Sequence, residues 1–208
     1  MSLDCVLSDL DGTLIDTRDI RLASFIETLR YFRVSDVTER EIIPHIDESP
    51  LFVLKSFGIN SIDIYWDRYA HNIPLQLKLF DPFLRTKIYT LKKSSVKLGI
   101  VTSLKKHMAN TLIETACIAD LVDILVSYGR IKKPSPYPLL KAIGQLEVCA
   151  EKTIYIGDRN LDIMAGRHAE ILTGAVLWSG GKNAFKGCLP DYWFHSFDEV
   201  VECALQMD

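Results

Sequence analysis

Two aspartates separated by a single residue form the most distinctive polar pair near the N-terminus. Asp9 and Asp11 belong to the segment DLDGT, residues 9–13, which follows a short apolar run over residues 3–8. In an extended backbone, side chains two residues apart point to the same side, so the two carboxylates would lie close together. Their repulsion must then be offset by a cation or a shared proton. Taken alone, the segment is equally typical of a polar turn after a strand.

Two further segments carry groups that suit a phosphate. Thr102 ends the apolar run over residues 96–102, and Ser103 follows it. A hydroxyl there, together with N–H groups at the start of a following helix, can hold a phosphate oxygen. Ser103 is equally suited to be the N-cap of that helix. Lys133, which precedes Pro134, can supply a point charge to a phosphate, although lysines are common in surface loops.

A second acidic pair lies in the segment GDRNLD, residues 157–162. Asp158 follows the apolar run over residues 153–156, and Asp162 comes four residues later, on the same face if a helix has begun. Beside Asp9 and Asp11, these carboxylates would make an oxygen-rich site suited to Mg²⁺. The alternative is that they are ordinary acids at a helix start, where the helix dipole favours them.

The apolar runs are predicted to be strands that position these segments. The predicted strands cover residues 3–8, 96–102, 124–127, 153–156, 175–178 and 192–194. Helical patterns alternate with them, including a loop and helix over residues 134–146 and a final helix over residues 197–205 with Ser196 as N-cap. This alternation predicts an α/β fold, a Rossmann-like parallel sheet with helices on both faces. Ligands bind beyond the carboxyl ends of such strands, so the polar segments are expected at one edge.

Residues 16–83 break the alternation, because their patterns are helical. Helices are predicted over residues 20–32, 38–46, 51–57 and 62–73. Thr38 and Glu41 form a capping-box pattern, and Gly58 suits a helix stop. We interpret residues 16–83 as an inserted helical domain, with a core domain made of residues 1–15 and 84–208. The aromatic residues of the insertion are predicted to form its own core; they are Phe52, Phe57, Tyr65, Trp66 and Tyr69.

Composition limits the classes of function. The chain has 208 residues, of which 48% are hydrophobic and 25% charged, an ordinary globular balance. Its net charge of −3 and the absence of a basic stripe in the sequence argue against binding to nucleic acid or to a membrane surface. A phosphate substrate is still compatible, because a metal can supply local positive charge. No apolar run approaches the ~20 residues of a membrane helix. The acidic N-terminal residues do not resemble a secretory signal, and the five cysteines lack a CxxC pair, so we expect a cytoplasmic protein.

Together, the order and spacing of these segments resemble the haloacid dehalogenase-like (HAD) superfamily, in its branch of phosphoglycolate phosphatases and β-phosphoglucomutases. DLDGT matches the first motif, Thr102 the second, Lys133 before Pro134 the third, and GDRNLD the fourth. The resemblance covers nearly the whole chain, including a helical cap domain between the first and second motifs. It implies a Mg²⁺-dependent phosphatase that hydrolyses a small phosphorylated metabolite.

The resemblance also implies roles for the acidic residues. Asp9 would be the nucleophile that forms an aspartyl-phosphate, and Asp11 the general acid and base. Asp9, Asp158 and the backbone carbonyl of Asp11 would ligate Mg²⁺. Asp162 would either ligate the metal or orient Lys133 or a metal-bound water.

The same resemblance assigns the phosphoryl group to hydroxyls and a lysine. Thr102 and Lys133 would bind its oxygens, and Ser103 could do so as well, although it stands where the branch often has Asn. The branch often leaves the cap through a Pro-Gly turn, whereas this chain has Asp81-Pro82-Phe83. Cations of the cap could contact the substrate or simply face solvent; they are Arg18, Arg30, Arg33 and Lys55.

Three other functions are compatible with this pattern. A phosphomutase would return the phosphoryl group to a sugar instead of to water. A phosphonate hydrolase would need a cap lysine, for which Lys55 is a formal candidate, but members of that type usually lack the second carboxylate that Asp11 supplies. A catalytically silent binding protein is disfavoured, because closely placed buried carboxylates without a metal would only cost stability.

Overall fold

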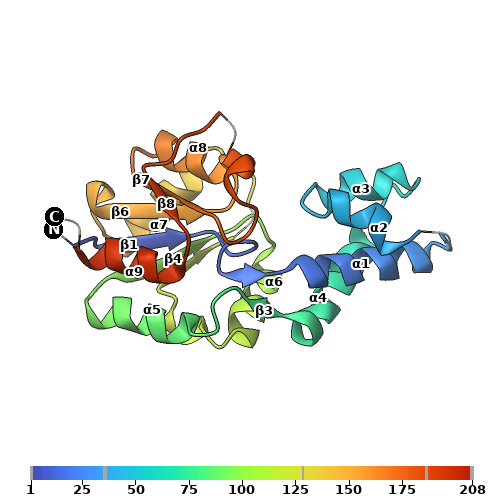
Figure 1. The fold of residues 1–208 in the computed structure, drawn as a ribbon, viewed down its shortest axis with the longest axis horizontal. Coiled ribbons are helices and arrows are strands. Elements are labelled where there is room, and N and C mark those ends of the chain that lie inside the picture. Colours follow the sequence, from blue (N-terminus) through green and yellow to red (C-terminus); the bar gives the residue numbers. More distant parts are fainter. Residues whose placement is uncertain (1, 35–36, 128, 186, 207–208) are drawn as a thin grey trace. The chain divides into compact units, whose positions relative to one another are not determined.

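The structure is a computed structural model that describes residues 2–34, 37–127, 129–185 and 187–206 (Figure 1). The chain divides into two compact units. The core unit comprises Met1–Asp16 and Leu79–Asp208, and the helical unit comprises Thr17–Lys78. The chain passes between them at two short strands, β2 (Ile15–Asp16) and β3 (Lys78–Leu79).

The core unit is built on a six-stranded sheet with the order β5-β4-β1-β6-β7-β8, in which every pair of neighbours is parallel. Its strands are β1 (Cys5–Ser8), β4 (Lys97–Val101), β5 (Ile124–Val126), β6 (Thr153–Gly157), β7 (Leu172–Val176) and β8 (Tyr192–Phe194). The predicted α/β fold with a parallel sheet is therefore confirmed.

The register of the central strand brings the polar segments together. Ser8, the last residue of β1, is paired with Ile100 of β4 on one side and with Ile156 of β6 on the other. The three chains therefore leave the sheet side by side and in the same direction. Their next residues include Asp9, Thr102 and Asp158, which the sequence predicted at this edge.

Helices cover both faces of the sheet. Helices α7 (Tyr137–Leu146) and α8 (Asn160–His168) pack against β1, β4 and β6 through one apolar cluster. Figure 1 shows α5 (Leu84–Lys93) and α9 (Phe197–Gln206) on the side of the sheet opposite α8. The remaining helices of the core unit are α6 (Lys106–Thr115) and the 3-10 helices η2 (Ala119–Leu121), η3 (Ala150–Lys152) and η4 (Lys182–Phe185).

Two elements of the core unit differ from the prediction. The strand predicted at residues 175–178 is β7, which begins earlier, at Leu172, because Gly174 does not interrupt it, and which ends earlier, at Val176. A Cβ at Gly174 would lie 2.4 Å from the ring of Phe194, so this glycine serves close packing and not a turn. Helix α5 was missed, although Leu84, Ile88 and Leu91 carry its buried face at helical spacing.

The helical unit contains the helices expected in the insertion. They are α1 (Arg18–Tyr31), α2 (Glu39–Ile42), the 3-10 helix η1 (Ile43–His45), α3 (Pro50–Ser56) and α4 (Asp63–Gln76). The predicted capping box is present, because the backbone N–H of Thr38 donates to Glu41 Oε2 at 2.8 Å. Gly58 ends the α3 segment with a φ of 77°, as a helix stop requires.

An aromatic group fills the centre of the helical unit. The rings of Phe25 and Tyr65 lie 4.6 Å apart between centroids, and Tyr69 is also buried. The prediction was wrong for Phe52, which is 63% exposed. Helix α3 has only two turns and turns Val53 and Leu54 inward, which leaves Phe52 on its outer side.

Two findings bear on the environment of the protein. All five cysteines are free thiols. Across the described part of the chain, each helix is too short or too polar to cross a lipid bilayer.

Candidate active site

The segment after β1 is a tight turn that anchors Asp9 and directs Asp11. The backbone N–H of Asp9 continues the sheet by donating to Ile156 O at 2.9 Å. The turn then closes on the carbonyl of Leu10, which accepts from the N–H groups of Leu14 and Ile15, both at 3.1 Å. Gly12 makes this possible with a φ of 84°, a left-handed conformation that other residues resist. The turn therefore holds Asp9 buried and leaves Asp11 half-buried.

A tryptophan from a distant loop supports the same turn. The indole N–H of Trp178 donates to the carbonyl oxygen of Thr13 at 2.8 Å. In the sequence, Trp178 is only the last residue of a predicted strand, so no role in the site was predicted for it. The contact ties the loop after β7 to the segment that carries the two N-terminal aspartates.

Lys133 lies between two carboxylates at the centre of the site. Its Nζ is 3.0 Å from Asp9 Oδ1 and 2.6 Å from Asp162 Oδ1, and its side chain is only 6% exposed. Burial alone would lower the pKa of Lys133, but Asp162 and Asp9 outweigh burial and hold that pKa above its usual range. The lysine is therefore charged, and its charge is directed at Asp9.

Asp162 accepts hydrogen bonds from this lysine and from the backbone at the start of its own helix. Its Oδ1 accepts from Lys133, and its Oδ2 accepts from the backbone N–H of Arg159 at 3.1 Å. Gly157 permits this close approach, because a Cβ there would lie 2.4 Å from the Cβ of Asp162. Both carboxylate oxygens of Asp162 are thus already hydrogen-bonded to protein groups.

Tyr155 of β6 is a member of the site that the sequence analysis missed. It is fully buried, and its hydroxyl lies 2.9 Å from Lys133 Nζ and 3.1 Å from Asp162 Oδ1. Burial and the charges of Asp162 and Asp9 hold the pKa of Tyr155 well above its usual range, so the hydroxyl keeps its proton. The one available signal was a polar group inside a strand that precedes Gly157 and Asp158.

Three buried carboxylates gather at this edge of the sheet. Oxygens of Asp9, Asp158 and Asp162 lie within 4.8 Å of one another. Burial raises the pKa of Asp9 to about 6, although Lys133 opposes that shift. Burial and the charges of Asp162 and Asp9 raise the pKa of Asp158 to about 8, and Asp11 adds to this effect. The site is therefore short of positive charge despite the presence of Lys133.

These residues fit a divalent cation. Within the part of the chain that the structure describes, Asp158 Oδ1 is buried and has no hydrogen-bond partner. An unsatisfied carboxylate oxygen beside the acid Asp9 is a donor set that hard cations such as Mg²⁺ favour. Asp162 is less suited to ligation, because its two oxygens are occupied by Lys133 and Arg159.

Thr102, Ser103 and Lys133 line one small cavity of about 10 Å³. Thr102 is buried at the end of β4, and its Oγ1 accepts from the backbone N–H of Leu104 at 3.2 Å. The alternative interpretation of Ser103 as a helix N-cap is wrong, because α6 begins at Lys106 and Lys105 is its cap. The structure thus brings the three predicted phosphate-binding residues to one place.

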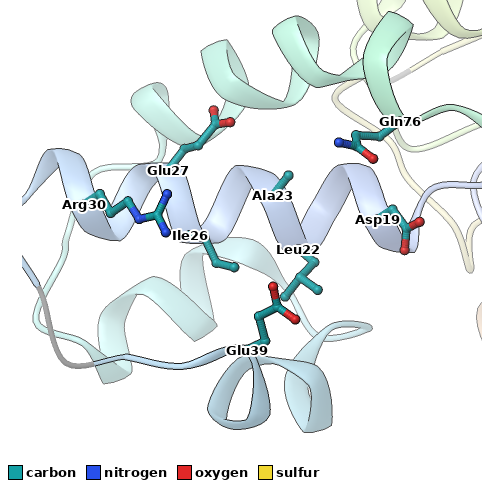
Figure 2. A pocket seen from close by; sticks show the side chains of 8 residues that line it. All are labelled: Asp19, Leu22, Ala23, Ile26, Glu27, Arg30, Glu39 and Gln76. Carbon is teal, nitrogen blue, oxygen red and sulfur yellow. The ribbon is translucent and has the colours of Figure 1, made fainter.

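The cations predicted in the insertion are all exposed; they are Arg18, Arg30, Arg33 and Lys55. Arg30 differs from the others because it lines a pocket of about 430 Å³ within the helical unit (Figure 2). In Figure 2, Leu22 and Ile26 point from α1 toward Glu39 of α2, and Gln76 lies at the end of α4. The pocket has the size of many small-molecule sites.

The core unit combines a Rossmann-like sheet, the segment DLDGT after its first strand, a buried lysine beside the first aspartate of that segment and a third acid after β6. This combination defines a known class of proteins. The chain belongs to the haloacid dehalogenase-like hydrolase family, whose sequence profile matches residues 6–176. Among individual proteins, it is 27% identical to pyrophosphatase PpaX of Anoxybacillus flavithermus, with 97% of this chain and 96% of that protein covered.

Solved structures show the same fold at lower identity. A haloacid dehalogenase-like family hydrolase from Streptococcus pneumoniae is 22% identical, with 95% of this chain and 96% of that one covered and a TM-score of 0.79. A predicted phosphoglycolate phosphatase from Haemophilus somnus is 17% identical, with 97% and 98% covered and a TM-score of 0.80. At such identities these likenesses establish the fold alone.

Proposed function

We propose that this protein is a Mg²⁺-dependent phosphatase that hydrolyses a small phosphorylated metabolite through an aspartyl-phosphate on Asp9. The observation that carries the proposal is the 3.0 Å ion pair between Lys133 Nζ and Asp9 Oδ1, placed beside the buried carboxylate of Asp158. A nucleophilic carboxylate and a phosphoryl group are both negative, so positive charge must be concentrated where they meet.

The reaction has two displacements. Asp9 attacks phosphorus and forms the aspartyl-phosphate, while Asp11 gives its proton to the departing oxygen of the substrate. Asp11 then takes a proton from a water molecule, which attacks phosphorus, releases orthophosphate and restores Asp9. Throughout, Thr102, Ser103 and Lys133 bind the oxygens of the phosphoryl group. The half-buried position of Asp11 supports this role, since the leaving group must reach it from solvent.

A bound Mg²⁺ would offset the repulsion among the buried acids and neutralise charge on the phosphoryl oxygens. Asp9, Asp158 and the backbone carbonyl of Asp11 are the groups that would hold it. We assign Asp162 mainly to Lys133, because its Oδ1 already accepts from that ammonium at 2.6 Å. Ligation by Asp162, the alternative from the sequence, would place the metal on an oxygen that already accepts a hydrogen bond from the protein.

The proposed substrate class is a small phosphorylated molecule. The relative named a pyrophosphatase makes pyrophosphate the first compound to test, followed by phosphoglycolate and sugar phosphates. We propose that residues 16–83 serve as the cap domain and select substrates by the part beyond the phosphoryl group. We also propose a cytoplasmic enzyme, which the five free thiols support.

The test compares Asp9→Asn with a matched surface variant, Asp67→Asn. The wild-type protein should release orthophosphate from p-nitrophenyl phosphate in the presence of Mg²⁺ and lose that activity in a chelator. Acid quenching of the wild type with ³²P-labelled substrate should trap radioactivity on the protein. Asp9→Asn should show neither turnover nor trapped label, because an amide cannot form the acyl-phosphate, and Asp67→Asn should behave as the wild type. Turnover in a folded Asp9→Asn protein would contradict the proposal, and phosphoryl transfer to a sugar hydroxyl would indicate a mutase.

A further inference from the structure

Tyr155 occupies a position that none of the four polar segments includes. It lies in the middle of β6 and is fully buried. Its hydroxyl is 2.9 Å from Lys133 Nζ, 3.1 Å from Val101 O at the end of β4, and 3.1 Å from Asp162 Oδ1 in α8. One phenol therefore joins β4 and β6, the two strands on either side of β1, to a helix and the lysine.

The hydrogen-bonding capacity of these groups determines what the phenol does. The ammonium of Lys133 has three N–H donors, and it donates to Asp162 Oδ1, to the Tyr155 hydroxyl and, at 3.5 Å, to Val101 O. Asp9 Oδ1 lies 3.0 Å from Nζ as an ion pair but accepts no hydrogen bond from it. Tyr155 has one proton, which it can donate to Val101 O or to Asp162 Oδ1. In either case the hydroxyl oxygen is left to accept from Lys133. Each ammonium proton thus has one acceptor, and the ammonium as a whole forms an ion pair with Asp9.

We propose that Tyr155 is a positioning residue that, together with Asp162, holds the Lys133 ammonium in place so that its charge lies against Asp9. This inference rests on the proposed function, because the position of the ammonium charge matters most when Asp9 carries or attacks a phosphoryl group. Without the Tyr155 hydroxyl, the ammonium would keep one short hydrogen bond, to Asp162, and a 3.5 Å contact to Val101 O, which would leave it freer to rotate about its Cε–Nζ bond. A second acceptor at 2.9 Å removes that freedom.

The hydroxyl can be separated experimentally from the ring. The ring of Tyr155 belongs to the apolar cluster with Leu7, Val101 and Ala165, and its centroid lies 5.5 Å from Lys133 Nζ. Phenylalanine keeps the ring and its packing but removes the acceptor. Tyr89→Phe is a matched control, because Tyr89 is exposed on α5 of the same core unit.

The first measurement is steady-state hydrolysis of p-nitrophenyl phosphate with Mg²⁺. Tyr155→Phe should lower kcat/KM by about 10- to 100-fold, because a misdirected charge stabilises the transferring group poorly. The inhibition constant for orthophosphate should rise as well. The Mg²⁺ concentration for half-maximal activity should not change, since Tyr155 contacts neither Asp9 nor Asp158 in the described hydrogen bonds. Tyr89→Phe should match the wild type in all three.

The second measurement does not depend on turnover. In ¹⁵N-labelled protein, the ammonium protons of Lys133 should exchange slowly with water in the wild type and faster in Tyr155→Phe. If the wild type hydrolyses no phosphate ester, the proposed function fails while this comparison still tests the positioning role. Equal ammonium exchange together with equal orthophosphate inhibition in Tyr155→Phe would overturn the inference. A lower melting temperature with unchanged inhibition would also overturn it, by showing that the hydroxyl is purely structural.

Discussion

Gly12 lies so close to Asp158 that a side chain cannot fit between them. A Cβ built on Gly12 would be 2.4 Å from Asp158 Oδ2, well inside van der Waals contact. The backbone of Gly12 also has a φ of 84°. The glycine therefore meets two separate requirements, one of conformation and one of space.

The substitution pair Gly12→Ala and Gly58→Ala separates these two requirements. Gly58 has a similar φ of 77°, but a Cβ there meets nothing within 4 Å among the described residues. Gly58→Ala should lower the free energy of unfolding by about 1–2 kcal/mol, the cost of a left-handed alanine, and leave hydrolysis unchanged. Gly12→Ala should cost more stability and also displace Asp158, so that activity falls and more Mg²⁺ is needed. Denaturant unfolding and Mg²⁺ titrations provide the measurements, and a Gly12→Ala protein with wild-type activity would contradict the expectation.

Removing the buried charge of Asp158 is predicted to raise stability in the absence of metal and to lower activity. Burial and the charges of Asp162 and Asp9 raise its pKa to about 8, so the metal-free fold loses stability as the pH rises above the ordinary aspartate pKa, and the loss is complete once the pH exceeds about 8. Asp158→Asn should therefore unfold at a higher temperature than the wild type in a chelator at pH 8, with a gain of about 1 kcal/mol or more. Mg²⁺ should stabilise the wild type and have little effect on the variant, which should be nearly inactive.

Differential scanning calorimetry with and without Mg²⁺ tests this expectation, with Asp67→Asn as the control for a charge change on the surface. The direction of the change in stability on Asp158→Asn decides between the two interpretations. If Asp158→Asn is less stable than the wild type in chelator, the acidic cluster is a structural hydrogen-bonding group and not a cation site.

Arg30 offers a test of substrate selection by the helical unit. Among the candidate cations of the insertion, it lines the pocket of Figure 2 together with Leu22, Ile26 and Glu39. If the helical unit selects substrates as proposed, Arg30→Ala should change the relative kcat/KM values within a panel of phosphorylated substrates, because Arg30 is the basic residue among those that line this pocket. Turnover of p-nitrophenyl phosphate should change least.

Lys55→Ala is the matched control, since Lys55 is exposed on α3 and is not among the residues that line this pocket. Lys133→Ala should lower activity on every substrate, because Lys133 would bind the phosphoryl group that all of them share. The measurement is a substrate panel for the three variants. A uniform loss in Arg30→Ala would mean that the residue supports structure and does not select substrates.

The amino-acid sequence by itself determined where strands end and which polar groups follow them. Asp9, Thr102 and Asp158 could be placed after strands because an apolar run and the polar residue that ends it are local features. The helices of the insertion were predictable for the same reason, since capping and helical spacing act over a few residues. The exposure of Phe52 was not, because which side of α3 faces inward depends on its neighbours in space.

The tertiary structure alone decided which of these groups meet and what each one does. In the sequence, Tyr155 is one more large residue in a buried strand, and its polar partners Val101 and Lys133 are 54 and 22 residues away. They meet because β1 lies between β4 and β6, an order that no local pattern specifies. Likewise, the sequence left two roles open for Asp162, and in the structure its Oδ1 lies 2.6 Å from Lys133 Nζ. A buried charge must be paired with an opposite charge or a hydrogen-bonding group, and the fold determines which such groups lie near enough.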